Sequence, residues 1–331
     1  MRDRLWPAVL FVRWMLCKSS GGGYPVETPG FNGTALCGKD EVMTYNGLAC
    51  APMAARGAFV LFLLVPLQSG SAAPDGIVLA PHRAIYELTL ATTRGGTGVS
   101  SVAGRMAYDL TGSTCEGYTQ NMRFVTRMTN QSGNAVVTDL RSSTWEDARG
   151  KRFRFDSSQY RDEKATDTTV GDAARPGTSE DIKVELTKPA KKNISIPSRV
   201  YFPVQHTIAL LNAAKATKTS FRADLYDGSE KGEKVYDTVA AIGRAQGAGS
   251  NRQLPQIKSA ERLDGLKGWP VSIAYFEPGS GKQDALPVYE LSFLMFENGV
   301  SRKLYIDYGE FSLQGDLTEI TFYPPSKCET K

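Results

Sequence analysis

Apolar and polar residues alternate with a period of two through much of this sequence from residue 82 onward. The segment Ile182-Lys183-Val184-Glu185-Leu186 is typical, with an apolar side chain at every second position and a charged one between. This pattern indicates a β-strand with one buried and one exposed face. A chain with many such strands must bury their apolar faces together, and a large curved sheet does so.

About twelve segments show the alternation or a short apolar run, and turn-forming residues separate most of them. The predicted strands are 82–91, 99–110, 115–128, 135–145, 152–160, 181–187, 220–226, 234–242, 269–276, 288–296, 300–308 and 317–323. Asn298-Gly299 is a strong hairpin signal, because both residues accept the positive φ of a tight turn. Short connections favour antiparallel pairing. The prediction is therefore a mainly β fold with one large curved antiparallel sheet, either a barrel, a half-barrel or a spiral.

One segment has helical spacing instead. Residues 203–215 begin with Pro203, which suits a first helical turn, and continue with good helix formers. Val204, Ile208 and Leu211 form an apolar stripe along one side. We predict one substantial α-helix here that buttresses the sheet.

An export signal precedes the strands. Arg56 is followed by the apolar run 58–67 and then by the small residues Gly70, Ser71 and Ala72. This order is typical of a secretory signal peptide, and the run is too short to cross a bilayer. We predict cleavage near Ala72 and a location outside the cytoplasm.

The signal divides the chain into three predicted parts. Residues 1–52 are interpreted as an upstream extension from a mis-called start, with Met53 or Met43 as the initiator. Residues 53–72 are the signal peptide, and 73–331 form a single β-rich envelope domain. The chain has 39 Lys and Arg against 35 Asp and Glu, so its charge does not favour nucleic acid as a partner.

The cysteines predict one disulfide. Of five cysteines, only Cys115 and Cys328 follow the predicted cleavage site. An isolated pair in an exported chain is typical of a structural disulfide, here between the C-terminal tail and an early strand. A redox-active pair is less favoured, because no Cys-x-x-Cys spacing occurs.

Catalytic signatures are sparse, and we predict no catalytic residue, cofactor or metal. The sequence has no Gly-x-Ser-x-Gly nucleophile elbow whose serine His82 or His206 could activate. We interpret both histidines as structural residues that form hydrogen bonds. The loop 279–282, Gly-Ser-Gly-Lys, lacks the first glycine and the Ser or Thr of a phosphate-binding loop. The protein is therefore predicted not to be an enzyme.

Two less favoured readings concern carboxylates and aromatic residues. The pairs Asp307 with Glu310, or Glu290 with Glu297, would suit an envelope-polymer hydrolase. Aromatic residues on the strands are mostly expected in the core, but a concave apolar face could also hold an acyl chain. These aromatic residues are Tyr86, Tyr108, Phe124, Trp145, Phe153, Phe155, Trp269, Tyr275, Phe276, Phe293, Phe296, Tyr305, Tyr308 and Phe311.

Four segments together carry a family resemblance. They are LAPHRAIY at 79–86, DGS at 227–229, GWPVSIAYF at 268–276 and the stretch from YELSF at 289–293 to LYIDYGEF at 304–311. The sequence from about Leu79 to Cys328 resembles the EipB family, exported cell-envelope integrity proteins of alphaproteobacteria. The resemblance implies a periplasmic spiral β-sheet with one buttressing helix and a disulfide that maps onto Cys115 and Cys328.

The resemblance also implies a role in envelope homeostasis with a periplasmic tetratricopeptide-repeat protein as a partner. Together with the export signal, it makes a non-enzymatic periplasmic factor that maintains the cell envelope through protein–protein binding our leading hypothesis. The alternative is a periplasmic carrier with a lipid or lipoprotein ligand.

Replacing Cys115 or Cys328 by serine is expected to lower the Tm of the exported protein and to raise its protease sensitivity. The predicted disulfide closes a long loop. By lowering the conformational entropy of the unfolded chain, it would stabilise the folded state by about 5 kcal/mol at most. Thermal unfolding with and without reductant measures the effect, and the reduced wild-type protein is the control. An unchanged Tm in both variants would contradict the prediction.

Overall fold

A single antiparallel sheet of 14 strands dominates the structure, a computed structural model that describes residues 76–95, 98–247, 257, 259–279, 285–324 and 326. The sheet is open, and one α-helix accompanies it within the described residues. The predicted mainly β fold with one helix is thus confirmed. The predicted upstream extension and signal peptide lie outside the described residues.

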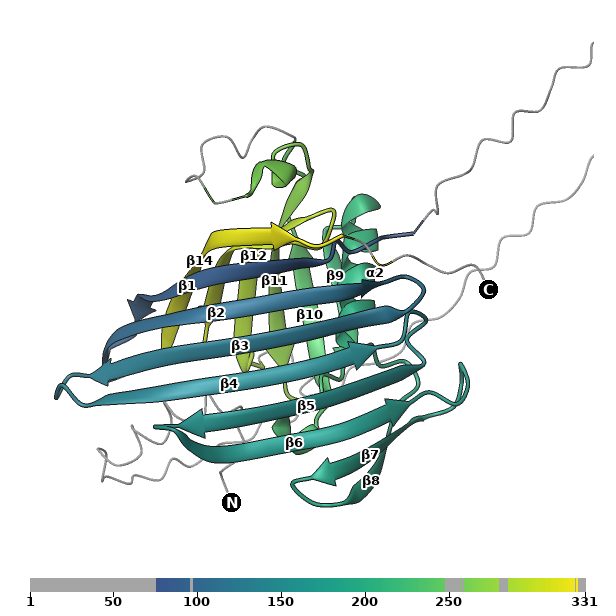
Figure 1. The fold of residues 1–331 in the computed structure, drawn as a ribbon, viewed down its shortest axis with the longest axis horizontal. Coiled ribbons are helices and arrows are strands. Elements are labelled where there is room, and N and C mark those ends of the chain that lie inside the picture. Colours follow the sequence, from purple (N-terminus) through teal and green to yellow (C-terminus); the bar gives the residue numbers. More distant parts are fainter. Residues whose placement is uncertain are drawn as a thin grey trace, which may run out of the picture. The chain divides into compact units, whose positions relative to one another are not determined.

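The elements follow the chain in a simple order (Figure 1). The strands are β1 His82–Thr93, β2 Val99–Ser113, β3 Gly117–Asn130, β4 Ala135–Glu146, β5 Arg152–Arg161, β6 Lys164–Ala174, β7 Ile182–Lys188, β8 Lys192–Ile196, β9 Ser220–Leu225, β10 Tyr236–Ile242, β11 Gly268–Phe276, β12 Tyr289–Phe296, β13 Ser301–Asp307 and β14 Phe311–Phe322. The helix α2 is Pro203–Lys215, and η1 Glu230–Gly232 and η2 Glu261–Leu263 are short 3-10 turns.

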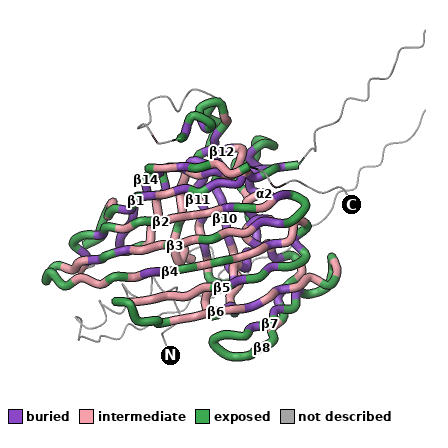
Figure 2. The backbone as a smooth tube through the Cα atoms, in the orientation of Figure 1, coloured by how far each residue is buried: buried purple, intermediate pink, exposed green. Residues whose placement is uncertain are grey.

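The chain enters the sheet in its middle. The strand order is β8-β7-β6-β5-β4-β3-β2-β1-β14-β13-β12-β11-β10-β9, so the first and last strands pair and two arms extend from them. The two edges, β8 and β9, are consecutive in the sequence and are joined by α2. Along β1 and β7, buried residues alternate with more exposed ones, as the two-residue period requires (Figure 2).

A buried aromatic cluster joins the two arms near these edges. Phe153 of β5 stacks on Phe202, just before α2, with ring centroids 5.1 Å apart. Phe155 meets Tyr226, just after β9, edge to face at 5.7 Å. Residues 182–196 of β7 and β8 add aliphatic side chains to the same cluster. Side-chain packing, rather than strand pairing, therefore connects the β5–β8 region to the end of β9.

The helix α2 has the predicted bounds and fills the space between the arms. Its buried side chains pack with those of β9–β12, and Leu110 of β2 and Tyr118 of β3 belong to the same core cluster. His206 of α2 lies 3.0 Å from the hydroxyl of Thr238, which itself donates to the carbonyl of Ala223. Burial lowers the pKa of His206 to about 4, so the ring is neutral and donates to Thr238.

A carboxyl group from β4 caps the start of α2. Phe202 precedes the helix and carries no side-chain oxygen for the first free amides. Glu146, at the end of β4, accepts hydrogen bonds from the backbone N–H of Val204 at 2.7 Å and of Gln205 at 2.8 Å. Glu146 is only 2% exposed, so water does not reach this site and the carboxyl group is the hydrogen-bond partner of both backbone N–H groups. The first turn of the helix is thereby attached to the opposite arm.

The sequence analysis missed two strands, β6 and β8, in which bulky apolar residues do not alternate clearly with polar ones. On β6, the buried positions hold Thr169, Gly171 and Ala173, because a Cβ at residue 171 would lie 2.4 Å from the ring of Phe155. Small residues are required there, so the strand lacks the alternation of bulky apolar and polar residues that predicts a strand from sequence. Strand β8 has only five residues and pairs only with β7.

Two further details differ from the prediction. Strand β14 begins at Phe311 rather than at 317, and Gly315 interrupts its pattern where Leu88 and Leu304 approach. The hairpin after β12 has a three-residue loop in which only Gly299 has a positive φ, at 87°. Asn298 therefore does not share the left-handed conformation that the Asn-Gly signal predicted. No helix in the described residues has the length and apolar character needed to cross a membrane.

We expect the stabilising contribution of Glu146 to fall as pH rises. Burial raises the pKa of Glu146 to about 8 in the folded protein, from an ordinary value of 4.5. Between these values the folded state holds a proton that the unfolded chain has released, so stability is present at low pH and is lost as pH rises toward 8.

Glu146→Gln cannot titrate, so the difference in unfolding free energy between wild type and variant should shrink by about 1–3 kcal/mol from pH 5 to pH 8.5. Urea unfolding across this range measures the difference. Glu185→Gln, on an exposed position of β7, is the control. A difference that stays constant with pH would show that Glu146 titrates normally.

Candidate functional site

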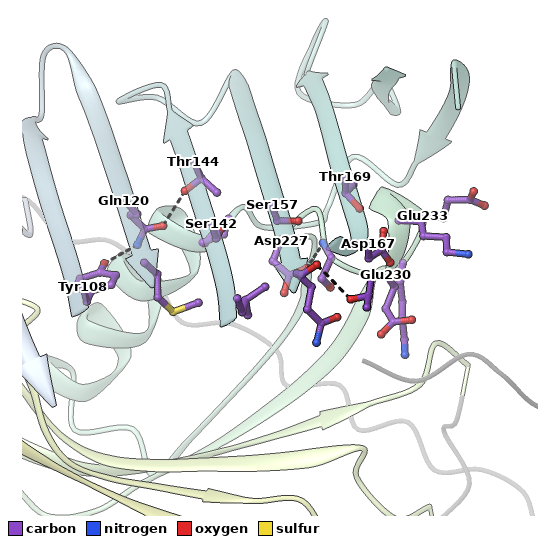
Figure 3. A pocket seen from close by; sticks show the side chains of 18 of the residues that line it. Tyr108, Gln120, Ser142, Thr144, Ser157, Asp167, Thr169, Asp227, Glu230 and Glu233 are labelled. Carbon is purple, nitrogen blue, oxygen red and sulfur yellow. Dashed lines mark hydrogen bonds between the residues drawn. The ribbon is translucent and has the colours of Figure 1, made fainter. Parts of the chain in front are cut away.

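A pocket of about 830 Å³ lies on the inner face of β2–β6 (Figure 3). Its floor is formed by side chains of these strands, and its opposite wall by residues 227–234, with Glu277 and Pro278. From the strands, the lining residues are Tyr108, Gln120, Met122, Leu140, Ser142, Thr144, Ser157, Gln159, Arg161, Thr166, Asp167 and Thr169. The start of α2 contributes Pro203.

The floor is ordered by strand register. Tyr108, Met122, Ser142, Ser157 and Thr169 are successive cross-strand partners from β2 to β6. Five strands give four spacings of about 4.8 Å, so this row is about 19 Å long. Hydroxyl groups dominate its β4–β6 part, whereas the β2–β3 end is aromatic and apolar.

Hydrogen bonds fix the side chains at the β2–β3 end. The amide of Gln120 donates to the hydroxyl of Tyr108 at 2.7 Å, and the Thr144 hydroxyl donates to the Gln120 carbonyl at 3.4 Å (Figure 3). Burial raises the pKa of Tyr108 to about 12, so its hydroxyl stays protonated. This end therefore presents a neutral, oriented set of polar groups beside Met122.

The wall opposite the floor, residues 227–234, is held close to the sheet by two glycines. Gly228 has φ of 75°, and a Cβ there would lie 2.5 Å from the Phe155 ring. Gly232 has φ of 70°, and its Cβ would lie 2.5 Å from Leu186. The hydroxyl of Tyr226 donates to the carbonyl of Gly232 at 2.8 Å. Only glycine permits this backbone to approach the core so closely.

Between these glycines, two larger residues adopt a strained conformation. Glu230 has φ of 50° and Lys231 of 60°, both in the left-handed region that non-glycine residues rarely occupy. Such strain costs about 1–3 kcal/mol per residue, and residues that carry it cluster at functional sites. The segment thus places Glu230 against the pocket at some cost in stability.

Carboxylates gather at the β6 end of the pocket. Asp167, Asp227 and Glu230 lie together there (Figure 3), and Glu233 and Glu277 also line the pocket. Burial raises the pKa of Asp227, although its carboxylate accepts the Ser229 N–H at 2.9 Å. Burial also raises the pKa of Glu230. The charge of Lys234 opposes this rise, and the nearby carboxylates of Glu277, Asp227 and Asp167 add to it. The pocket is therefore neutral at one end and acidic at the other.

Both histidines have the structural role predicted for them. His82 begins β1, is buried, and has Nδ1 at 2.7 Å from the carbonyl of Ala80. His206 is buried in α2 and bonded to Thr238. Neither lines the pocket, so neither contributes chemistry to it.

The carboxylates predicted as pairs are engaged elsewhere or lie apart. Glu290 and Glu297 lie near opposite ends of β12, so they do not form a pair. Asp307 accepts from Arg94 at 3.1 Å and from the Gly309 N–H at 2.7 Å, which places it in a turn beside Glu310. None of these four residues lines the pocket.

The expected apolar concave face differs from the pocket that the strands form. Of the aromatic residues on the predicted strands, only Tyr108 lines the pocket. Many of the others, such as Phe153, Phe155 and Trp269, are buried in the core. Ser142, Thr144 and Ser157 occupy the inner face instead, because α2 covers the neighbouring apolar positions.

Two sequence predictions reach beyond the described residues. Cys115 lies in the turn between β2 and β3, with Sγ 3.2 Å from the hydroxyl of Ser113, whereas Cys328 lies outside the described residues. Their pairing stays a prediction. Of the Gly-Ser-Gly-Lys loop, only Gly279 is described. Over the described part of the chain, no three His, Cys, Asp or Glu side chains are grouped to hold a metal ion.

The acidic segment was visible in the sequence only as a turn. Asp227-Gly228 signals a turn, but the sequence pattern around it does not show that Glu230 lies opposite strands β5 and β6, which are more than 50 residues earlier in the chain. The sequence also did not show which polar residues of β4 face the pocket. Ser142 and Ser143 lie on opposite faces of the strand, but both are polar.

Comparisons with known proteins agree with this fold. A family model described as EipB-like matches residues 73–324, as the resemblance in the sequence indicated. The chain is 36% identical over 279 residues to the cell envelope integrity protein EipB of Brucella abortus, covering 84% of this chain and 96% of that protein. A crystal structure of a β-barrel-like protein of a domain of unknown function from Brucella abortus matches with a TM-score of 0.67 and 35% identity. That match covers 74% of this chain and 99% of the other.

Gly228→Ala is expected to destabilise the protein more than Gly133→Ala. Both glycines have positive φ, at 75° and 82°, so both variants carry the backbone strain of a left-handed alanine. Only at 228 does the added Cβ meet the Phe155 ring, whereas nothing lies within 4 Å at 133. The difference should be about 1–3 kcal/mol, the usual cost of an overpacked core. Urea unfolding measures it, and equal losses would show that the 227–234 segment is not held by this contact.

Proposed function

Because the chain belongs to the EipB-like family, we propose that it maintains the integrity of the cell envelope from the periplasm by binding another envelope protein. The name of its relative supports a role in envelope integrity. The export signal that the sequence predicts at 53–72 supports the periplasmic location. Binding is the step that the pocket itself supports.

The row of polar side chains across β2–β6 carries this proposal. A row of about 19 Å matches an extended polypeptide segment of about six residues. Hydroxyl and amide side chains such as Ser142, Ser157 and Gln159 both donate and accept hydrogen bonds, as main-chain amides require. A segment of a partner protein laid across the strands would find these groups along its length.

Catalysis is less well supported than binding. The serine and threonine hydroxyls of the pocket have no histidine among the described lining residues to activate them. Its carboxylates gather at the β6 end of the cavity (Figure 3), where two of them, Glu233 and Glu277, are already paired with lysines. We therefore propose a non-enzymatic role.

The partner proposed first is a periplasmic tetratricopeptide-repeat protein, the kind that the family resemblance implies. A lipid ligand remains the alternative. Among the lining residues, the aliphatic side chains of Met122 and Leu140 would contact its acyl chain. Native mass spectrometry of the exported protein distinguishes the two, because a bound acyl lipid adds its own mass.

The proposal predicts that filling the pocket abolishes function without unfolding the protein. Ser142→Trp places a large ring on the floor, whereas Ser143→Trp places it on the exposed outer face of the same strand. In a host that lacks the wild-type gene, Ser143→Trp should restore resistance to detergent stress and Ser142→Trp should not.

Both variants must be exported, soluble and equal to wild type in Tm for this comparison. A photo-crosslinking residue at position 159 should also yield one discrete adduct with an envelope protein, lost in Ser142→Trp. Full rescue by Ser142→Trp would show that the pocket does not carry the function.

A further inference from the structure

We propose that the acidic end of the pocket binds a cationic group, an ammonium or a guanidinium, of the pocket's occupant. The inference deepens the proposed function and rests on it, since it names the chemistry by which a bound segment would be recognised. It depends on the charges of the pocket, on buried polar atoms beside it, and on the order of groups along the floor.

The pocket contains more carboxylates than cations. Its lining includes five carboxylates, Asp167, Asp227, Glu230, Glu233 and Glu277, and three cations, Arg161, Lys231 and Lys234.

Two of these carboxylates already have partners. Lys234 pairs with Glu277 at 2.7 Å, and Lys192, from β8, pairs with Glu233 at 2.6 Å. Asp167 and Glu230 have no ion-pair partner among the described residues, and they lie together at the pocket end (Figure 3). The charge of Lys234 also acts on Glu230, but Lys234 is itself paired with Glu277, so this end of the pocket keeps an excess of carboxylates for an occupant.

Buried polar atoms beside this end lack hydrogen-bond partners. Tyr236 is fully buried, and its hydroxyl has none within the described structure. The hydroxyl of Ser229 lies beside it without hydrogen-bond geometry, and one carboxylate oxygen of Glu230 is buried and equally unpaired. Unsatisfied buried polar groups are costly, and several together indicate a missing partner.

The chemistry of these atoms fits a nitrogen cation. The carboxylates of Glu230 and Asp167 line the pocket and offer acceptor oxygens to it, whereas the Tyr236 hydroxyl lies behind the lining, beside Ser229. An ammonium has three donors and a guanidinium five, with no acceptor to be left unpaired. A metal ion fits less well, because the described acidic residues form no group of three that could ligate one. A neutral or anionic ligand would leave the carboxylates uncompensated.

The order of groups along the floor gives the occupant a direction. The aromatic and apolar end at Tyr108 and Met122 is separated from Asp167 by the hydroxyls of Ser142 and Ser157. An extended segment would therefore carry its basic side chain at the β6 end and an apolar one at the β2–β3 end. The cation could belong to a lysine or arginine of a partner protein or to a free amine, which the experiment distinguishes.

Three probes test the inference with the exported full chain. They are the peptide acetyl-Leu-Ala-Ala-Ala-Lys-amide, the same peptide with norleucine for lysine, and 1,5-diaminopentane. Calorimetry with wild type should give binding of the lysine peptide that is at least about tenfold tighter than that of the norleucine peptide, as expected for a charge-assisted hydrogen bond. Comparable binding of the diamine would assign the site to free amines. Binding of the lysine peptide alone would assign it to a polypeptide.

Glu230→Gln and Asp167→Asn should each weaken the lysine peptide by about tenfold and leave the norleucine peptide unchanged. Glu163→Gln is the matched control, because Glu163 also has a positive φ, at 68°, but lies in the β5–β6 turn outside the pocket. Equal binding of both peptides, unaffected by Glu230→Gln, would overturn the cationic site but preserve segment binding. No binding of any probe to wild type would also overturn it, while the Ser142→Trp comparison in cells judges the proposed function separately.

Discussion

The two hydrogen bonds that Glu146 accepts from the first turn of α2 connect the arms of the sheet. Strands β8 and β9 are its open edges, and α2 is the connection between them. The helix begins beside a hydrophobic residue, Phe202, that cannot cap it, so its buried amides depend on a carboxyl group from β4. Without that group they would be unsatisfied in the core, at about 1–3 kcal/mol each. The aromatic stacking of Phe153 on Phe202 and the position of Pro203 in the pocket wall both depend on this attachment.

Close contact between glycines and one phenylalanine determines how wide the pocket is. The ring of Phe155 lies against Gly171 of β6 on one side and against Gly228 of the acidic segment on another. Larger residues at these positions would separate the segment from the sheet. Because the approach is so close, Glu230 lies near Asp167 instead of extending into solvent. The same packing that stabilises the aromatic cluster therefore also creates the acidic end of the pocket.

The sequence predicts the fold well wherever the buried face of a strand carries bulky residues. The helix at 203–215 and strands such as β7 follow directly from apolar period. Strand β6 does not, because its contact with Phe155 demands Thr169, Gly171 and Ala173. The pocket could not be predicted either, since β4 carries polar residues on both of its faces and the acidic wall comes from a distant turn. Such a site depends on register and on tertiary approach, which a single sequence does not encode locally.

A chain whose interior served stability alone would not have this pocket. The apolar face of α2 packs between the arms, and apolar side chains in place of Ser142, Ser157 and Gln159 would extend that core. The protein instead holds hydroxyls there, and Glu230 and Lys231 of the opposite wall are in strained conformations. Each feature lowers the stability of the empty protein, and each is offset when an occupant supplies hydrogen bonds and a positive charge. The polar interior is therefore better explained as a binding surface than as an incompletely packed core.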